Sequence, residues 1–235
     1  MFFFFSLTAL ILAAIYSVNN PEIQYALFLS FIAGISTSIG ALIPKLFPVN
    51  IQFSLSLAAG VMVFVSFCDM IPEAVSILGH KFAYFCFFLG ILAIKAVNFL
   101  LPEQGSAFFI ALAISVHNFP EGLATLLAGQ HKKGIAMCFA ISLHNIPEGM
   151  SVAIPLLAEG NPRAFEIASF SGLMEPLGAL FFHFLWGEVE ERVFGIFMAG
   201  IAGIMVYIGI CEMKPQWEGF VTGMAVMALG VVLME

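Results

Sequence analysis

The chain has 235 residues, of which 61% are hydrophobic and only 10% are charged. An ordinary soluble domain has roughly a quarter of its residues charged, so this composition excludes a soluble globular protein. The net charge is −7, and the eight Lys and Arg residues are scattered, which argues against a nucleic-acid partner. We therefore expect an integral membrane protein.

The apolar residues come in blocks of about twenty, the length that a helix needs to cross a hydrocarbon layer about 30 Å thick. The first block, 1–18, is rich in Phe. It has no preceding Lys or Arg and no clear small-x-small cleavage site, which favours an uncleaved additional helix over a signal sequence. Runs such as 108–116 lack the alternation of a membrane β-strand. The predicted fold class is therefore all-α, a polytopic bundle of eight transmembrane helices plus the extra N-terminal helix. The eight predicted spans are 23–43, 51–72, 82–101, 105–129, 134–158, 164–186, 193–213 and 217–234.

No soluble insertion between these blocks exceeds about ten residues, which leaves no room for a separate soluble module. Residues 23–234 are therefore predicted to form one domain. The four cysteines lie in apolar runs without CxxC spacing, so we interpret them as core residues rather than as disulfides or metal ligands. They are Cys68, Cys86, Cys138 and Cys211.

A ten-residue stretch occurs twice, as AISVHNFPEG at 113–122 and as AISLHNIPEG at 140–149. Each copy places a His four residues before a Glu, so the two side chains share one face of a helix with 3.6 residues per turn. Imidazole, amide and carboxylate groups on adjacent faces form a ligand set for a divalent cation, and the imidazoles favour Zn²⁺ or Fe²⁺. The residues are His117, Asn118 and Glu121 in the first copy, and His144, Asn145 and Glu148 in the second.

A proline follows each Asn by two positions. Pro120 and Pro147 have no N–H to donate, so each helix is expected to be kinked and to leave a carbonyl oxygen free beside the ligands. The segment 130–133 joins two helices that must run in opposite directions. Both motifs then lie roughly 16–20 Å from the same surface, near the middle of the membrane, and can face one another.

Four further acidic residues lie inside or at the ends of spans. A charged side chain at a helix centre costs about 2.5–3.5 kcal/mol on insertion scales, so a deep carboxylate indicates function. Glu175 lies in the middle of its span beside Pro176, where a divalent cation would favour the ionised carboxylate. The alternative for the paired motifs and Glu175 is hydrogen bonding between helices without a ligand, and the alternative for the three acidic residues near span ends is an ordinary solvated carboxylate. A role in the ion pathway is left open for Asp69, Glu73 and Glu212, whereas His80, His131 and His183 are interpreted as non-ligands.

The sequences HNFPEG at 117–122 and HNIPEG at 144–149, on the fourth and fifth predicted spans, resemble the signature of the ZIP (Zrt/Irt-like) metal transporters. The segment SGLMEPLGA around Glu175 is similar to the sixth-span motif that supplies a further metal ligand in that family. This resemblance extends over about 23–234. It implies uptake of Zn²⁺ into the cytoplasm, with Fe²⁺, Mn²⁺, Co²⁺ and Cd²⁺ as further candidates, and makes the metal a transported substrate rather than a cofactor. It also implies a two-metal centre within the membrane whose ligands are His117, Asn118, Glu121, His144, Asn145, Glu148 and Glu175.

The chain departs from many members of that family in one loop. Many members have a long His-rich loop between the third and fourth spans, whereas this chain has only residues 102–105 there. The short loops look most like those of the bacterial zinc-uptake branch. This implies a multi-pass protein of the cell inner (plasma) membrane. The expected partners are divalent metal ions and the lipid bilayer, and a homodimer is left open.

Two other classes remain open on the residues alone. An intramembrane zinc protease has its Glu directly after the first His and a second His at i+4, a pattern that HNxPE lacks. A proton-coupled carrier of another solute would use the glutamates as proton relays but would not need paired imidazoles. We therefore predict a transporter and not an enzyme.

Overall fold

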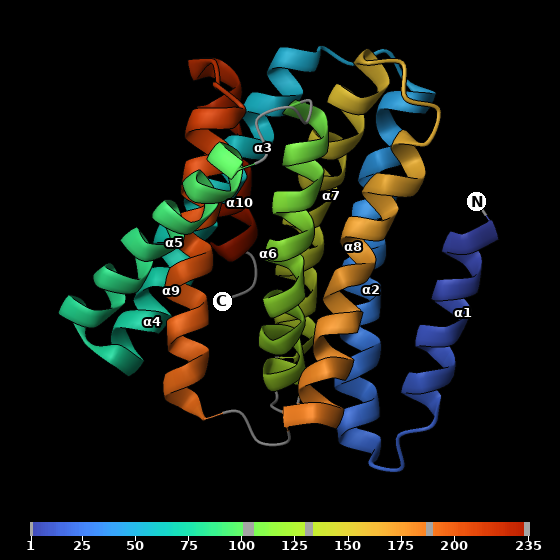
Figure 1. Ribbon diagram of the computed structural model, residues 1–235, viewed down its shortest axis with the longest axis vertical. Coiled ribbons are helices and arrows are strands. Elements are labelled where there is room, and N and C mark those ends of the chain that lie inside the picture. Colours follow the sequence, from blue (N-terminus) through green and yellow to red (C-terminus); the bar gives the residue numbers. More distant parts are fainter. Residues whose placement is uncertain (1, 101–105, 130–133, 187–189, 233–235) are drawn as a thin grey trace. The chain divides into compact units, whose positions relative to one another are not determined.

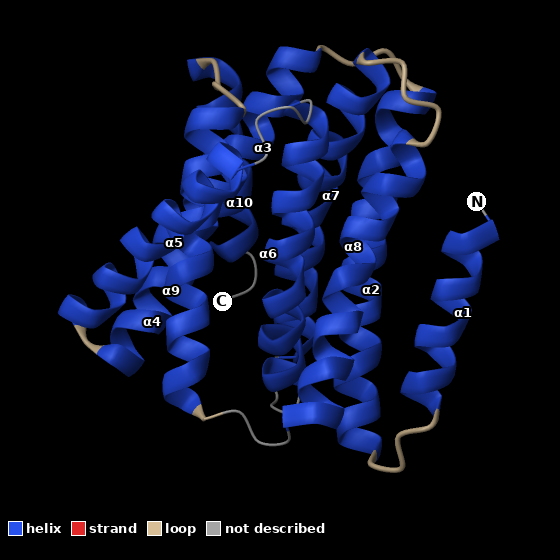
Figure 2. Cartoon of the chain, in the orientation of Figure 1, coloured by secondary structure: helices blue, strands red, loops and turns tan. Residues whose placement is uncertain are grey.

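The computed structural model describes residues 2–100, 106–129, 134–186 and 190–232, and every regular element in these ranges is a helix (Figures 1 and 2). This confirms the predicted all-α class. Five helices in these ranges are long and apolar enough to cross a membrane, which is consistent with a multi-pass membrane protein; the total of eight spans stays a prediction. The five are Pro21–Leu46, Ile51–Leu78, His80–Val97, Ala164–Phe184 and Glu191–Glu212.

Most helix ends lie within a few residues of the predicted ones. The second span is an exception, because α4 (Ile71–Leu78) carries the helix beyond residue 72. A π-helical turn, η1 (Ser66–Met70), links α4 to α3 (Ile51–Val65). In this turn Ile71 donates its backbone N–H to the Ser66 carbonyl, five residues back. A wide turn lets the helix accommodate the proline at position 72, which has no N–H to donate.

The helices form two compact units built from interleaved parts of the chain. The first contains Met1–Pro48 and Ile114–Glu188, and the second contains Val49–Ala113 and Val189–Leu233. No linker in the sequence marks this division, because each unit takes two separate stretches. The sequence-based prediction of one transport domain over 23–234 remains a prediction.

The first unit has a core of four helices: α2 (Pro21–Leu46), α7 (Gly134–Ala158), α8 (Ala164–Phe181) and, from Ile114 onward, α6 (Ser106–Gly129). Glycines bring their backbones into contact. A Cβ on Gly122 of α6 would overlap the carbonyl oxygen of Glu175 in α8, and a Cβ on Gly178 of α8 would overlap that of Phe119 in α6. Small residues at such positions let membrane helices approach closely. The Gly that ends the first HNxPEG motif is therefore a packing residue.

The same arrangement recurs between α7 and α2. A Cβ on Gly149 would overlap the carbonyl oxygen of Thr37, and one on Gly40 would overlap that of Ile146. The motif residues Gly122 and Gly149 are 27 positions apart, as are Phe119 and Ile146. Their partners Glu175 on α8 and Thr37 on α2 are 138 positions apart, as are Gly178 and Gly40. The α6–α8 pair and the α7–α2 pair are thus two copies of one arrangement, in which Thr37 is the counterpart of Glu175.

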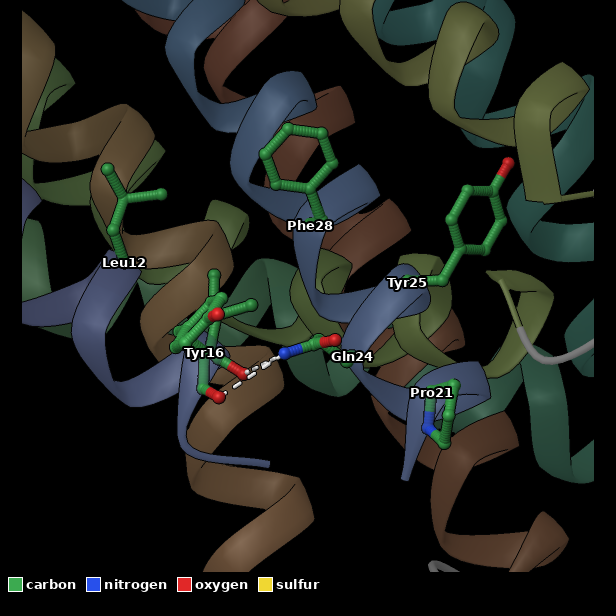
Figure 3. A pocket seen from close by; sticks show the side chains of 7 residues that line it. Leu12, Tyr16, Pro21, Gln24, Tyr25 and Phe28 are labelled. Carbon is green, nitrogen blue, oxygen red and sulfur yellow. Dashed lines mark hydrogen bonds between the residues drawn. The ribbon is translucent and has the colours of Figure 1, made fainter. Parts of the chain in front are cut away.

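The N-terminal helix α1 (Phe2–Tyr16) packs outside this core, against α8 and α2. The rings of Phe4 and Phe165 have centroids 6.1 Å apart. The Gln24 side-chain amide donates to the carbonyls of Ile15 and Tyr16, which stabilises the C-terminal end of α1 (Figure 3). A cavity of about 410 Å³ lies between α1 and α2, and none of the motif residues lines it.

The second unit contains α3, η1, α4, α5 (His80–Leu100), α9 (Glu191–Tyr207), η3 (Ile208–Glu212) and α10 (Trp217–Val232). Here too glycines allow close helix contact, since a Cβ on Gly60 of α3 would overlap the Phe220 carbonyl of α10. The turn before α10 is tied to α3: Gln52 donates to the Lys214 carbonyl at 3.0 Å, and the Gln216 N–H donates to the Ser56 hydroxyl at 2.8 Å.

The glycine contacts predict that Gly122→Ala and Gly149→Ala each destabilise the protein, because overpacking of this kind costs about 1–3 kcal/mol. We expect a lower Tm in detergent, measured by thermal unfolding of the purified protein. Gly200→Ala is the matched control, because a Cβ there meets nothing closer than the Cys86 carbonyl at 3.9 Å. Equal Tm values for all three variants would contradict this account of the motif glycines.

Candidate metal centre

Both HNxPEG motifs lie in the first unit, on α6 and α7. Each helix continues without interruption through its motif proline, Pro120 in α6 and Pro147 in α7. The four residues that separate the helices, 130–133, lie outside the described residues. The two helices nevertheless bring their motifs face to face, as the opposite directions of the two spans predict.

Two imidazoles and two carboxylates form one cluster between α6 and α7. Glu121 Oε1 lies 3.1 Å from Nε2 of His117 on its own helix and 3.0 Å from Nε2 of His144 on the other. His117 Nε2 also lies 3.2 Å from Glu148 Oε1. Four ligands in a tetrahedron around Zn²⁺, each at about 2.1 Å, are roughly 3.4 Å apart. The three measured separations are close to this value, and ligand atoms of His117, His144 and Glu148 lie within 4.8 Å of one another, so the cluster could close around a single divalent ion.

This cluster is removed from water. His117 and Glu148 are fully buried, and Glu121 is only 5% exposed. Oε2 of Glu121 and Oε2 of Glu148 are buried and have no hydrogen-bond partner. Unpaired charges are expensive to bury, and the sequences of α6, α7 and α8 contain no Lys or Arg. A divalent cation bound here would supply the missing positive charge.

The asparagine beside each His is oriented by a backbone carbonyl of a neighbouring helix. Asn118 Nδ2 donates to the Ser171 carbonyl at 3.0 Å, and Asn145 Nδ2 donates to the Ala33 carbonyl at 2.9 Å. With the amide nitrogens used in this way, Oδ1 of both residues is buried and has no hydrogen-bond partner. Each Asn therefore offers a neutral oxygen that can bind a metal ion.

Glu175 on α8 is fully buried and is held at both oxygens. Asn145 Nδ2 donates to its Oε2 at 2.8 Å, and the Thr125 hydroxyl donates to its Oε1 at 2.9 Å. Sequence reasoning overlooked Thr125. Its position was the available signal, because it lies four residues after Glu121 and so continues the same helix face by one turn.

The remaining acidic candidates belong to the second unit. Asp69 lies in η1, Glu73 in α4 and Glu212 in η3; the first two are exposed and Glu212 is half-buried. A role for them in the ion pathway stays a prediction. Asp69 and Glu212 each lie in a π-helical turn, a feature that is frequent at functional sites.

The histidines outside the motifs contact aromatic rings where the structure describes them. His80 begins α5 and stacks on Tyr84, and His183 contacts the ring of Phe184 in η2 (Phe182–Trp186). His131 lies outside the described residues.

All four cysteines are free thiols, as predicted. Cys86 and Cys138 are buried, but Cys68 and Cys211 are exposed, so their interpretation as core residues was wrong. Both lie in π-helical turns, Cys68 in η1 and Cys211 in η3.

These features describe a helical protein with membrane-spanning candidates and a buried His and Glu cluster on facing helices, an arrangement suited to a metal-ion transporter. The ZIP zinc transporter family matches residues 102–234. Curated relatives include zinc transporter ZupT of Corynebacterium aurimucosum, 38% identical over 92% of this chain and 99% of the relative. ZupT of Chlorobaculum parvum is 37% identical over 91% of this chain and 99% of the relative. ZupT of Streptococcus mutans is 36% identical over 88% of this chain and 97% of the relative. The chain belongs to the ZIP zinc transporter family, and it is a transporter rather than an enzyme.

The cluster geometry predicts that Glu121→Ala and Glu148→Ala each abolish metal binding, because each change removes a carboxylate from the cluster. We expect Zn²⁺ affinity, measured by isothermal titration on purified protein, to fall by at least a hundredfold while the protein still inserts and purifies normally. His183→Ala is the control, since this residue lies outside the cluster. Unchanged affinity in either Glu variant would exclude the assignment.

Proposed function

We propose that this protein takes up divalent metal ions, chiefly Zn²⁺, into the cytoplasm through the centre that the two HNxPEG motifs form. One observation carries this proposal: His117, Glu121, His144 and Glu148 form a closed, buried cluster with ligand spacing and with unpaired carboxylate oxygens. Membership of the ZIP family and the names of the relatives, which are zinc transporters, support Zn²⁺ as the main substrate.

We assign two metal positions to the centre. The first lies among the two imidazoles and the two motif glutamates. The second is richer in oxygen and lies toward α8, where Asn145 links the centre to Glu175. Glu121 and Glu148 each have two carboxylate oxygens and so can serve both positions. The ligands of the two positions together are His117, Asn118, Glu121, His144, Asn145, Glu148 and Glu175.

This ligand set suits an ion that must enter and leave. The carboxylates replace the water that a divalent ion loses when it enters the membrane, and their charge offsets the cost of that loss. The imidazoles favour Zn²⁺ over Mg²⁺ and Ca²⁺, which prefer oxygen ligands only. Neutral amide oxygens add ligands without further charge, so the ion is not held too tightly for release.

The proposed location is the cell inner (plasma) membrane, in line with the bacterial sources of the relatives. The ion is substrate here, and no further cofactor is required by the chemistry. The two alternatives of the sequence analysis, a metalloenzyme and a proton-coupled carrier of another solute, are not favoured by the family.

Transport by the purified protein alone is the direct test of this function. Liposomes that contain only this protein should accumulate radioactive ⁶⁵Zn²⁺ above the level of empty liposomes. Competition with Fe²⁺, Mn²⁺, Co²⁺ and Cd²⁺ ranks the other candidate substrates. Zn²⁺ entry no faster than into empty liposomes would refute the proposal.

Replacement of an imidazole by a carboxylate predicts a change in selectivity, because all-oxygen sites suit Mn²⁺ better than Zn²⁺. His144→Asp should weaken competition by Zn²⁺ relative to Mn²⁺ by about tenfold in the liposome assay. If the order of competition stays that of the wild type, His144 does not bind the transported ion. His80→Asp is a control, since His80 lies in the second unit at the start of α5.

A further inference from the structure

We propose that Thr125 is a positioning residue that holds the Glu175 carboxylate in the orientation in which it binds the metal ion. This inference rests on the proposed function, since Glu175 is one of the proposed ligands. Thr125 lies on α6, is 1% exposed, and its hydroxyl lies 2.9 Å from Glu175 Oε1 on α8.

The two hydrogen bonds to Glu175 fix the plane of its carboxylate. Thr125 donates to Oε1 and Asn145 donates to Oε2, one donor for each oxygen. A carboxylate offers about four lone-pair positions in all, so two donors still leave positions for a metal ion. A Glu side chain otherwise loses considerable rotamer entropy when it binds, and a carboxylate that is already held avoids part of this cost.

The Thr125 hydroxyl has one hydrogen and two acceptors within reach. Besides Glu175 Oε1, the backbone carbonyl of Glu121 lies 3.1 Å away. That carbonyl is one helical turn back and normally accepts the Thr125 backbone N–H, so it does not need the hydroxyl. The charged carboxylate is the stronger acceptor. Because Thr is branched at Cβ, its hydroxyl direction is restricted, which suits a residue that orients another.

The duplicated arrangement of the first unit shows that packing does not require this hydroxyl. The counterpart of Thr125 on α7 is Val152, and the counterpart of Glu175 is Thr37. Val152 is fully buried, so this helical frame accommodates a side chain of the same shape without a hydroxyl. The position four residues after the motif Glu therefore carries a hydroxyl where the facing helix has Glu175, and a methyl group where the facing helix has Thr37.

The test compares Thr125→Val with Thr125→Ser in the full-length purified protein. We expect Thr125→Val to weaken Zn²⁺ binding and to slow ⁶⁵Zn²⁺ uptake by about tenfold with little change in Tm, and Thr125→Ser to restore both. Val152→Thr is the matched control, which should leave both unchanged. Thr125→Ala gives the same comparison if the Val variant does not fold. Wild-type binding in the hydroxyl-free variants, or no restoration by Ser, would overturn the proposal.

A double-variant comparison separates positioning from a general structural effect. If Thr125 acts through Glu175, then Thr125→Val should have little further effect in a Glu175→Ala background. An equal tenfold loss in that background would overturn the proposal. Loss of binding in Glu121→Ala together with no effect of Thr125→Val would refute only the role of Thr125. Full binding in both variants would instead refute the metal centre.

Discussion

The burial of three carboxylates among four closely packed helices is the constraint on which this structure depends. Glu121, Glu148 and Glu175 are at most 5% exposed, and charges in such surroundings are stable only with a compensating cation and suitable donors. The two imidazoles, the Asn145 amide and the Thr125 hydroxyl all contact these carboxylates. The proposed metal centre would thus account for most of the polar groups around these carboxylates.

Much of this centre follows from local periodicity. A His and a Glu four residues apart must share a helix face, and two copies joined by a short segment must face each other from antiparallel helices. The cluster of His117 and His144 with the two motif glutamates was therefore predictable. The helix class and most helix ends followed from apolar runs and proline positions, although a π-helical turn extended the second span.

The parts that were not predictable depend on contacts between distant segments. No local pattern shows that Thr125 meets Glu175, fifty positions away, or that Asn145 meets the Ala33 carbonyl. The division into two interleaved units likewise leaves no mark on composition. The motif glycines were visible in the sequence, but their role is defined by the helix opposite them. Such information lies in the pairing of helices, which a single sequence does not contain.

The glycine contacts have a consequence for how this protein can diverge. In the first unit the distance between the helices that carry the proposed ligands is set by contacts between backbone atoms, at Gly122 and Gly149 among other positions. Side chains on the outer surface of the unit take no part in setting that distance. Substitutions on the lipid-facing surface can therefore accumulate, as bilayer composition differs between organisms, while the separation of the ligands stays the same.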